Sequence, residues 1–224
     1  MPRFGGASRA VTSRWARATY LMACGVLLGS VWAMAPAASA QVDLPVIPDP
    51  VAVELDHSTT AYLLLDMVDA ICPARPSCPG TVPAATSLLT RARDAGALVV
   101  HTTGRAGGTQ MPGLEPLPSE RIVGAPADKF FGTDLDDILV SHGIRTVVIA
   151  GTAANGAPMY TTFGANLRGY TAVVVSDVLP GQTPFDTFLT QYQVLNEPGF
   201  DNPNNTPLVE GRVTLSRSDL ITFR

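Results

Sequence analysis

The sequence feature that most constrains the fold is a run of six residues, TAYLLL at 60–65, that ends directly at Asp66. A short run that is apolar on both faces is typical of a strand buried inside a parallel sheet. A buried parallel strand needs neighbouring strands on both sides and helices on both faces of the sheet. We therefore expect an α/β fold.

The rest of the chain continues this alternation of strands and helices. Pro83 suits the first turn of a helix that runs to about residue 95, with Gly96 as its C-cap. Thr133 and Asp136 resemble a capping box that opens another helix. Further strands are expected at 97–100, 144–150, 171–176 and 213–215, and further helices at 133–143, 155–168 and 185–196. This order predicts a doubly wound parallel sheet with helices on both faces, in a single domain.

The first forty residues have the pattern of a secretory signal peptide. Four arginines are the only charges before Asp43, residues 18–40 are uncharged, and the stretch ends in Ala-Ser-Ala at 38–40. We expect a cleaved signal at 1–40, an N-terminal arm at 41–58 rich in Pro and Asp, and one domain at 59–224. The protein would then be periplasmic or secreted. A retained membrane anchor and lipidation at Cys24 stay open as alternatives.

Charge and composition exclude several classes of protein. Loss of the four arginines changes the formal net charge from −4 to −8, which does not suit a nucleic-acid partner. With 46% apolar and only 15% charged residues the chain is not intrinsically disordered. No other stretch is long and apolar enough to span a bilayer, so no membrane association is expected after cleavage. A small-molecule ligand or substrate is the expected partner.

Polar residues follow the expected strands at their carboxyl ends, where ligands bind in such sheets. Asp66 is the leading candidate for a general base, with a structural turn cap as the alternative. His101 either lines the same pocket or is a structural histidine. His57, His101 and His142 lack the spacing of metal ligands, and no phosphate-binding or dinucleotide motif is present. No metal and no cofactor are therefore expected.

Cys72 and Cys78 remain after removal of the signal, in a segment that also holds three prolines. An exported cysteine pair in a proline-stiffened loop suggests a disulfide bond. Two free thiols, or one reactive cysteine, remain as alternatives.

Several segments together resemble the isochorismatase-like cysteine hydrolases. They are YLLLDM at 62–67, FGTDL at 131–135, VIAGTAANGA at 148–157, RGY at 168–170 and VVVSD at 173–177. The resemblance covers nearly all of 60–216 and implies a doubly wound α/β fold that often forms dimers or tetramers, so a homo-oligomer is possible. It also implies hydrolysis of small amides or a vinyl ether by an Asp–Lys–Cys triad, with the cysteine at a helix N-terminus behind a cis peptide.

Carried over residue by residue, the resemblance leaves the triad incomplete. Asp66 matches the family aspartate. The family spacing places the lysine at Gly124, whereas Lys129 is the only lysine of the chain and lies closer to the matched Phe. The nucleophile position falls on Ala157, whose methyl group cannot attack a carbonyl. The chain thus resembles an exported branch without the cysteine, or else carries an engineered Cys→Ala substitution.

The turn at 151–157 is expected to direct backbone N–H groups at the pocket, an arrangement that binds anions and oxyanions. The other candidate pocket residues are Thr152, Asn155, Gly156, Tyr160 and His101.

Three hypotheses follow for the function of the protein. The protein is a catalytically degenerate member that binds a small molecule, or a hydrolase in which Asp66, assisted by Lys129, activates water. The third is an α/β protein unrelated to the family.

Overall fold

The computed structural model describes residues 43–105 and 107–224, so the predicted signal peptide lies outside the described residues. Residues 44–224 form one compact unit. No helix in these ranges is long and apolar enough to cross a membrane.

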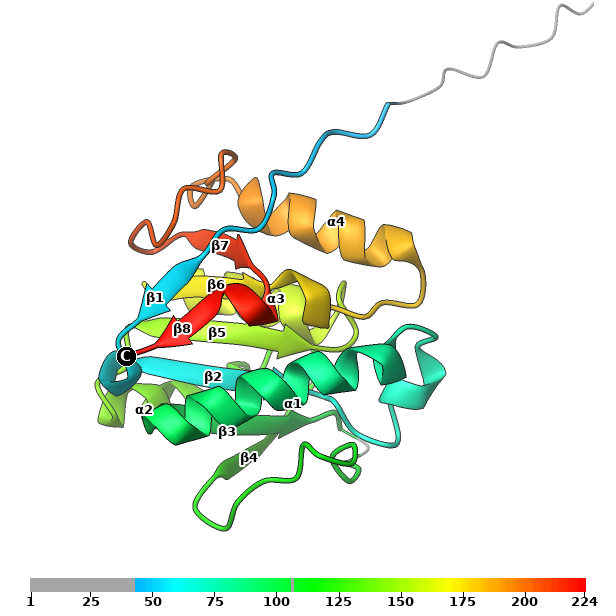
Figure 1. Ribbon diagram of the computed structural model, residues 1–224, viewed down its shortest axis with the longest axis vertical. Coiled ribbons are helices and arrows are strands. Elements are labelled where there is room, and N and C mark those ends of the chain that lie inside the picture. The colour runs from blue at the N-terminus through cyan, green and yellow to red at the C-terminus, as the bar shows by residue number, and fades with distance from the viewer. Residues whose placement is uncertain (1–42, 106) are drawn as a thin grey trace, which may run out of the picture. The chain divides into compact units, whose positions relative to one another are not determined.

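The core of the fold is a six-stranded sheet in which all neighbouring strands are parallel (Figure 1). Its order is β4 (Arg121–Gly124), β3 (Leu98–Thr103), β2 (Thr60–Leu65), β5 (Thr146–Gly151), β6 (Thr171–Val175) and β7 (Val213–Ser216). β2 lies at the centre, and all six of its residues are buried. This position explains why the run at 60–65 is apolar on both faces, and the predicted doubly wound α/β architecture is confirmed.

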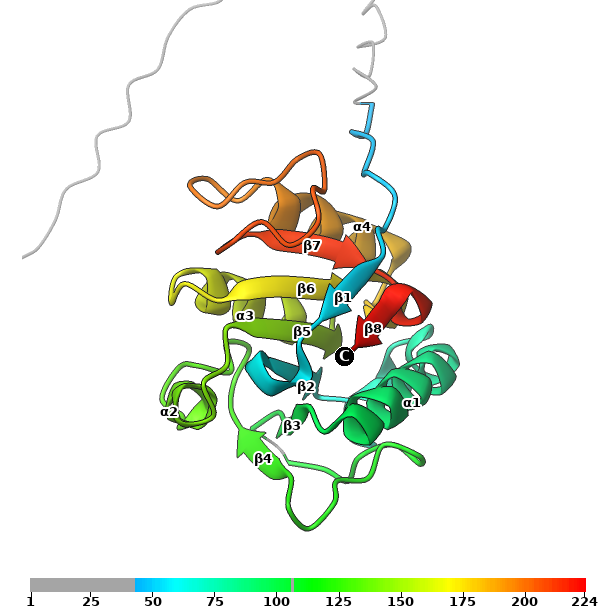
Figure 2. The same cartoon turned by 60° about the vertical axis from the view of Figure 1, so that its left-hand side comes forward.

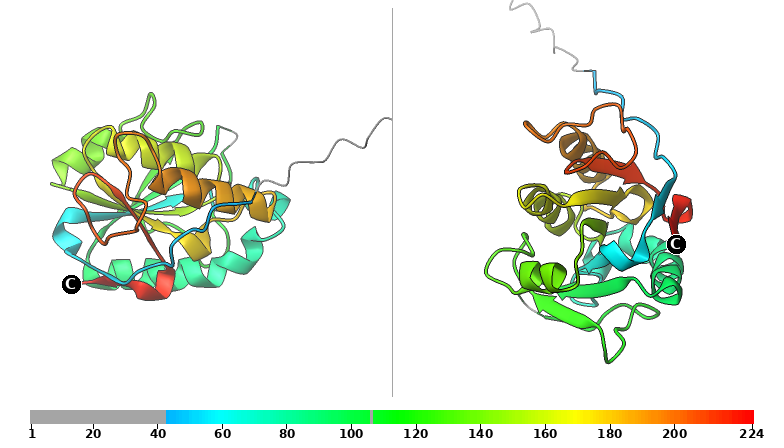
Figure 3. Two further views of the ribbon diagram at one scale, coloured as in Figure 1. Left: turned by 90° about the horizontal axis from the view of Figure 1, so that it is seen from above. Right: turned by 90° about the vertical axis from the view of Figure 1, so that its left-hand side faces the viewer.

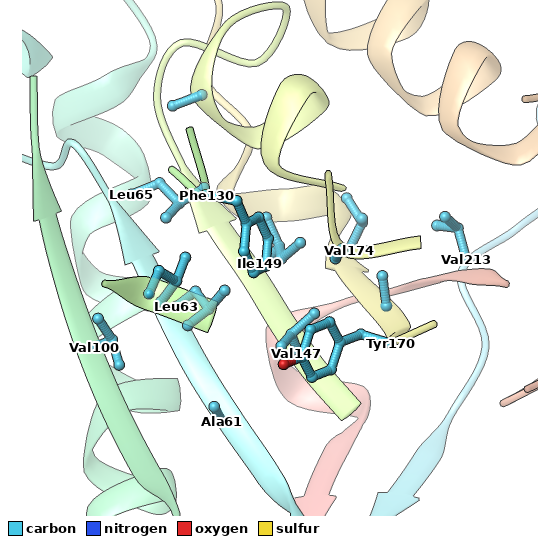
Figure 4. Packing of buried hydrophobic residues seen from close by; sticks show 14 of the residues in the cluster. Ala61, Leu63, Leu65, Val100, Phe130, Val147, Ile149, Tyr170, Val174 and Val213 are labelled. Carbon is cyan, nitrogen blue, oxygen red and sulfur yellow. The ribbon is translucent and has the colours of Figure 1, made fainter. Parts of the chain in front are cut away.

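Three helices cover one face of the sheet: α2 (Leu135–Ser141), α3 (Ala157–Asn166) and α4 (Pro184–Leu195). Ala61, Leu63 and Leu65 of β2 point into this layer and join one apolar cluster with Phe130 and Tyr170 (Figure 4). Figure 3 shows this helical layer on one side of the sheet and α1 on the other.

The opposite face is covered by α1 (Cys78–Ala95) and by a two-stranded parallel ribbon of β1 (Val53–Leu55) and β8 (Ile221–Phe223). Figure 2 shows this ribbon lying across the sheet beside α1. Tyr62 and Leu64, the alternate residues of β2, pack into this second cluster. Four short 3₁₀ helices complete the fold, at His57–Thr59, Cys72–Ala74, Ser176–Val178 and Ser218–Leu220.

Two helix starts differ from the sequence-based expectation. α1 begins at Cys78, so Pro79 occupies the first turn and Pro83 lies inside the helix. Thr133 does not form a capping box with Asp136, because its hydroxyl donates to the Lys129 carbonyl and α2 begins only at Leu135. A capping box is present instead at Thr183 and Asp186, where α4 begins. Gly96 is the C-cap of α1 as expected, with φ +81°.

Three short strands were not expected from the sequence. β1, β4 and β8 have three or four residues each and expose at least one side chain, so they give no clear apolar run. β1 belongs to the segment interpreted as an N-terminal arm. The structure pairs it with β8 and thereby joins the two ends of the described chain.

Candidate functional site

Asp66 lies at the carboxyl edge of the sheet, where β2 ends. Its φ of +53° is in the left-handed region, which few residues other than glycine adopt. The Thr102 hydroxyl, at the end of neighbouring β3, accepts the Asp66 N–H at 3.1 Å and donates to Oδ1 at 2.7 Å. One fully buried threonine thus fixes both the backbone and the carboxylate of Asp66.

Lys129 reaches Asp66 although its spacing in the sequence differs from that of the family. Its ammonium lies 2.8 Å from the Asp66 carboxylate and also donates to the carbonyls of Ala125 at 3.1 Å and Pro126 at 2.8 Å. The side chain is fully buried, so all its contacts are with protein. Gly124, the position indicated by the family spacing, is the last residue of β4 and precedes this loop.

The backbone of Lys129 is fixed by α3. Its N–H donates to the Thr161 hydroxyl at 3.2 Å, and that hydroxyl approaches the Ala127 carbonyl at 3.4 Å. The loop before α2 is therefore held against α3, and the long lysine side chain extends from it to the end of β2. A buried lysine charge is tolerated when its ammonium is paired with a carboxylate and all its N–H groups are hydrogen-bonded.

The turn between β5 and α3 lies directly against the end of β2. The Thr152 N–H donates to the Leu65 carbonyl at 2.9 Å, and a Cβ on Gly151 would lie only 2.0 Å from that oxygen. The peptide bond between Thr152 and Ala153 is cis. Glycine is therefore required at 151 for the chain to pass so close to the residue that precedes Asp66.

Ala157 is the first residue of α3, beside this turn. Its side chain is 3% exposed and packs in the apolar cluster with Leu65, Ala154 and Leu179. The N–H groups of Asn155 and Ala157 have no acceptor within the described part of the chain. The start of α3 therefore has backbone N–H groups without a protein acceptor and no nucleophilic side chain at 157.

The predicted disulfide is present, so neither Cys72 nor Cys78 has a free thiol. Cys72 and Cys78 are bonded, with an S–S distance of 2.11 Å and a Cα–Cα distance of 5.3 Å. Both side chains are fully buried in the second apolar cluster, with Met67.

Most other predicted pocket residues make structural contacts. The Thr152 hydroxyl donates to the Pro180 carbonyl at 3.2 Å, and the Asn155 amide donates to Asp186 of α4 at 2.9 Å. The Gly156 N–H donates to the Ala153 carbonyl at 2.7 Å. Tyr160 lies on the first turn of α3 and is half exposed.

His101 is not brought together with Asp66. Its Nε2 lies 2.8 Å from a carboxylate oxygen of Glu120, which also binds Arg93 of α1. Its Nδ1 is buried without a partner. Burial lowers the pKa of His101, and the Glu120 carboxylate opposes this shift only in part. A neutral imidazole that donates from Nε2 fits these contacts, so His101 is a structural histidine.

Sequence reasoning assigned no role to Thr102 or to Thr161. Threonine on a strand or helix gives no pattern that distinguishes such a contact from ordinary packing. No group of three or more His, Cys, Asp and Glu side chains within 43–105 and 107–224 could hold a metal ion.

The chain is similar in sequence to several known proteins. The family model described as Isochorismatase domain matches residues 60–187. Maleamate amidohydrolase of Pseudomonas putida is 30% identical over 149 residues, which are 52% of this chain and 70% of the relative. Streptothricin hydrolase of Streptomyces noursei is 34% identical over 102 residues, 40% of each chain.

Solved structures show the same fold at lower identity. A cysteine hydrolase from Pseudomonas syringae pv. phaseolicola 1448A matches with a TM-score of 0.62 and 18% identity, covering 80% of this chain and 95% of its own. N-carbamoylsarcosine amidase from Thermoplasma acidophilum matches with a TM-score of 0.58 and 21% identity, covering 72% and 97%. With the family model matching more than half of its length, this chain belongs to the isochorismatase family.

Proposed function

We propose that this protein binds a small carboxamide at the Asp66–Lys129–Ala157 site and does not cleave it through a covalent intermediate. The observation that carries the proposal is the combination of an intact, buried Asp66–Lys129 pair with an alanine at the head of α3. The aspartate and the lysine of the triad implied by the family resemblance are present and paired, and the position that this resemblance assigns to the nucleophile holds an alanine.

The donors and acceptors of the site suit a primary carboxamide. The carboxamide oxygen accepts from the free N–H groups of Asn155 and Ala157 at the N-terminus of α3. The carboxamide N–H₂ donates to the Asp66 carboxylate, whose oxygens retain acceptor capacity beyond their bonds to Thr102 and Lys129. Both relatives are named as hydrolases, and one of them as an amidohydrolase, which supports an amide as the ligand.

The second candidate function is hydrolysis by water. In this candidate a water between Asp66 and the bound carbonyl transfers a proton to the Asp66 carboxylate while its oxygen bonds to the carbonyl carbon. The carboxyl group then returns that proton to the nitrogen as the C–N bond breaks and ammonia leaves. The retained pair favours this candidate, and the methyl group of Ala157 disfavours any covalent route.

The decisive experiment restores the nucleophile. Ala157→Cys places a thiol at the head of α3, and we expect it to release ammonia from maleamate, while the parent protein binds maleamate without turnover. Asp66→Asn in the Ala157→Cys background should lower that rate by about 10²–10⁴-fold, the usual contribution of a general base. Ala154→Cys is the matched control, because it puts a thiol in the same turn but not at the helix start.

The outcomes separate the candidates. Ammonia release by the parent, abolished by Asp66→Asn in a protein whose circular dichroism is unchanged, would replace binding by water-based hydrolysis. Absence of maleamate binding to the parent, together with no gain of activity in Ala157→Cys, would reject both.

We also propose that the protein acts outside the cytoplasm, after cleavage following Ala40. The signal-like sequence and the disulfide support this, because disulfides persist in oxidising compartments. The mass of the protein recovered from the host should correspond to a chain that starts at Gln41. Recovery of the full-length chain from the cytoplasm would contradict the proposal.

A further inference from the structure

The chain that follows β3 returns to the residues that come directly after Asp66. Residues 109–111 run antiparallel to residues 67–69, with Gln110 opposite Val68. Two backbone hydrogen bonds, each of 2.8 Å, join these segments, one on either side of the bridge. β2 therefore holds the chain before Asp66, and residues 109–111 hold it after Asp66.

The side chain of Gln110 extends from this segment to the end of β3. It is 6% exposed, and its Nε2 donates to the Thr102 carbonyl at 3.1 Å. Successive carbonyls of a strand point to opposite sides, and the next one, that of Thr103, accepts from the Ala125 N–H just after β4. The Thr102 carbonyl therefore points to the β2 side, where the turn at Asp66 has ended that strand. Gln110 thus donates to a carbonyl that β2 no longer reaches.

Thr102 connects this amide to the site. Its carbonyl accepts from Gln110, while its hydroxyl accepts the Asp66 N–H and donates to the Asp66 carboxylate at 2.7 Å. The same carboxylate binds the Lys129 ammonium at 2.8 Å. Three consecutive hydrogen bonds thus run from Gln110 through Thr102 and Asp66 to Lys129. Since the carbonyl and the hydroxyl belong to one residue, a donor that fixes the carbonyl also limits the directions that the hydroxyl can take.

The Gln110 amide uses only its donor. Its Oε1 is buried without a hydrogen-bond partner among the described residues. A buried acceptor that stays unpaired lowers stability, and an apolar side chain of the same length would fill this space without that loss. This arrangement indicates that position 110 requires a donor, and the Thr102 carbonyl is the group that receives it.

We infer that Gln110 is a positioning residue of the site: through Thr102 it sets the direction in which the Asp66 carboxylate faces a bound carboxamide. Gln110 makes no hydrogen bond with Asp66 or Lys129 within the described residues, so its effect passes through Thr102. This role extends the proposed function, because the affinity for the ligand then depends on a side chain outside the Asp66–Lys129 pair. It rests on that function for the ligand only, and not for the orientation of Asp66.

The single lysine of the chain gives the test a direct readout. In protein labelled with ¹³C-lysine and expressed without a lysine-containing tag, Lys129 gives the only lysine side-chain signal in a nuclear magnetic resonance spectrum. That signal reports on the ammonium that contacts Asp66. Calorimetric titration with maleamate measures the affinity of the same samples.

Gln110→Met keeps the length of the side chain and removes its donor. We expect the Lys129 signal to move and maleamate to bind about tenfold more weakly, which is the usual effect of losing one good hydrogen bond to a charged group. The midpoint of urea unfolding should stay close to that of the parent, because the unpaired Oε1 is removed together with the donor. Gln110→Asn is one methylene group too short to keep the bond, so it should give the same two changes and carries the test if Gln110→Met does not fold.

Gln191→Met is the matched control. The Gln191 Nε2 also donates to a carbonyl at the end of a strand, that of Ser176 after β6, at 3.4 Å. This substitution should leave the Lys129 signal in place and the maleamate affinity within about twofold of the parent.

Each result decides the role of Gln110. An unmoved Lys129 signal in the Gln110 variants would overturn it, whatever the maleamate affinity, and would leave the proposed function standing. A moved signal with unchanged affinity would also overturn it, because the direction of the carboxylate would then not matter to the ligand. An equal movement in Gln191→Met would show an unspecific effect and overturn it as well. If maleamate does not bind to the parent, the proposed function fails, and the Lys129 signal alone decides whether Gln110 positions Asp66.

Discussion

Asp66 combines a left-handed backbone conformation, uncommon for a residue other than glycine, with a side chain held from two directions. The left-handed φ turns the chain sharply after β2, and the Thr102 hydroxyl bonds the N–H and the carboxylate that this turn brings to the same side. Lys129 then completes the environment of the carboxylate. The position of Asp66 at a strand end was predictable from the sequence, but its orientation depends on a threonine from another strand.

Thr102→Val removes this hydroxyl at nearly constant volume and leaves a buried N–H and a carboxylate oxygen each without one partner. We expect a loss of about 1–3 kcal/mol in the free energy of unfolding, measured by urea denaturation. Thr102→Ser should retain most of that stability because it keeps the hydroxyl. Thr103→Val is the matched control, since the Thr103 hydroxyl makes no hydrogen bond within the described residues; an equal loss in that variant would refute the role of Thr102.

His101 makes stability depend on pH. Burial holds its folded-state pKa below the ordinary value of 6.5, so below that pH the unfolded chain binds more protons than the folded one. The unfolding free energy should therefore fall as the pH drops from about 6.5 toward the lowered folded-state pKa. His101→Gln keeps a donor for Glu120 and should flatten the curve, measured by denaturation between about pH 5 and 7. Parallel curves for parent and variant would contradict this assignment.

At the scale of elements, the segment between β2 and α1 links Asp66, at its start, to the Cys72–Cys78 disulfide, which reaches the first residue of α1. Its path is constrained by the Cys72–Cys78 bond and by Pro79 in the first turn of α1. The sequence suggested the disulfide from a cysteine pair in a proline-stiffened loop of a chain expected to be exported, with free thiols as the alternative. It did not indicate where α1 begins, because Pro79 and Pro83 both suit the first turn of a helix. In the structure α1 begins at the disulfide-bonded Cys78, which places Pro79 in the first turn.

Opening the disulfide should lower stability by about 2 kcal/mol, the loop-closure entropy expected for a ring of this size. We expect this from the double substitution Cys72→Ala, Cys78→Ala, measured by urea denaturation. The parent denatured under reducing conditions separates the cross-link from the lost packing of the two buried sulfur atoms. If the reduced parent were as stable as the oxidised one, the cross-link would contribute nothing.

The central strands could be predicted because each is a continuous apolar run. The order of the helices between them could also be predicted from the sequence. The contact of Lys129 with Asp66 could not be predicted in this way. Its spacing from Phe130 is unlike that of the family, and only the packing of its loop against Thr161 of α3 shows that the ammonium reaches Asp66. The sequence thus predicted the edge where the site lies, but not how the loop carrying the lysine runs.

At the scale of the whole molecule, the β1–β8 ribbon joins segments that are far apart in the chain and packs them on the face covered by α1. His57 reinforces the join, because its backbone N–H and its Nδ1 both contact the Arg224 carbonyl, at 3.0 and 2.7 Å. The described chain between these ends is expected to unfold as one cooperative unit.

Ile221→Ala tests this, since Ile221 is buried in the cluster that contains α1 and β2. We expect a loss of about 2–5 kcal/mol in a single unfolding transition. Thr222→Ala on the exposed side of the same strand should cost less than about 1 kcal/mol. A second, separate transition in the Ile221→Ala protein would show that the ribbon folds independently of the sheet.

The bond between Arg224 and His57 has a practical consequence for handling the protein. His57 precedes β2, so Arg224 is held at the edge of the sheet where strands begin, whereas Asp66 and Ala157 lie where they end (Figure 1). Anything attached beyond Arg224, whether a sensor chip, a resin or a further polypeptide, would be anchored on the far side of the domain. Immobilisation through that residue leaves the edge that carries Asp66 and Ala157 facing the solution, which is the orientation that surface-based screening for ligands of this edge requires.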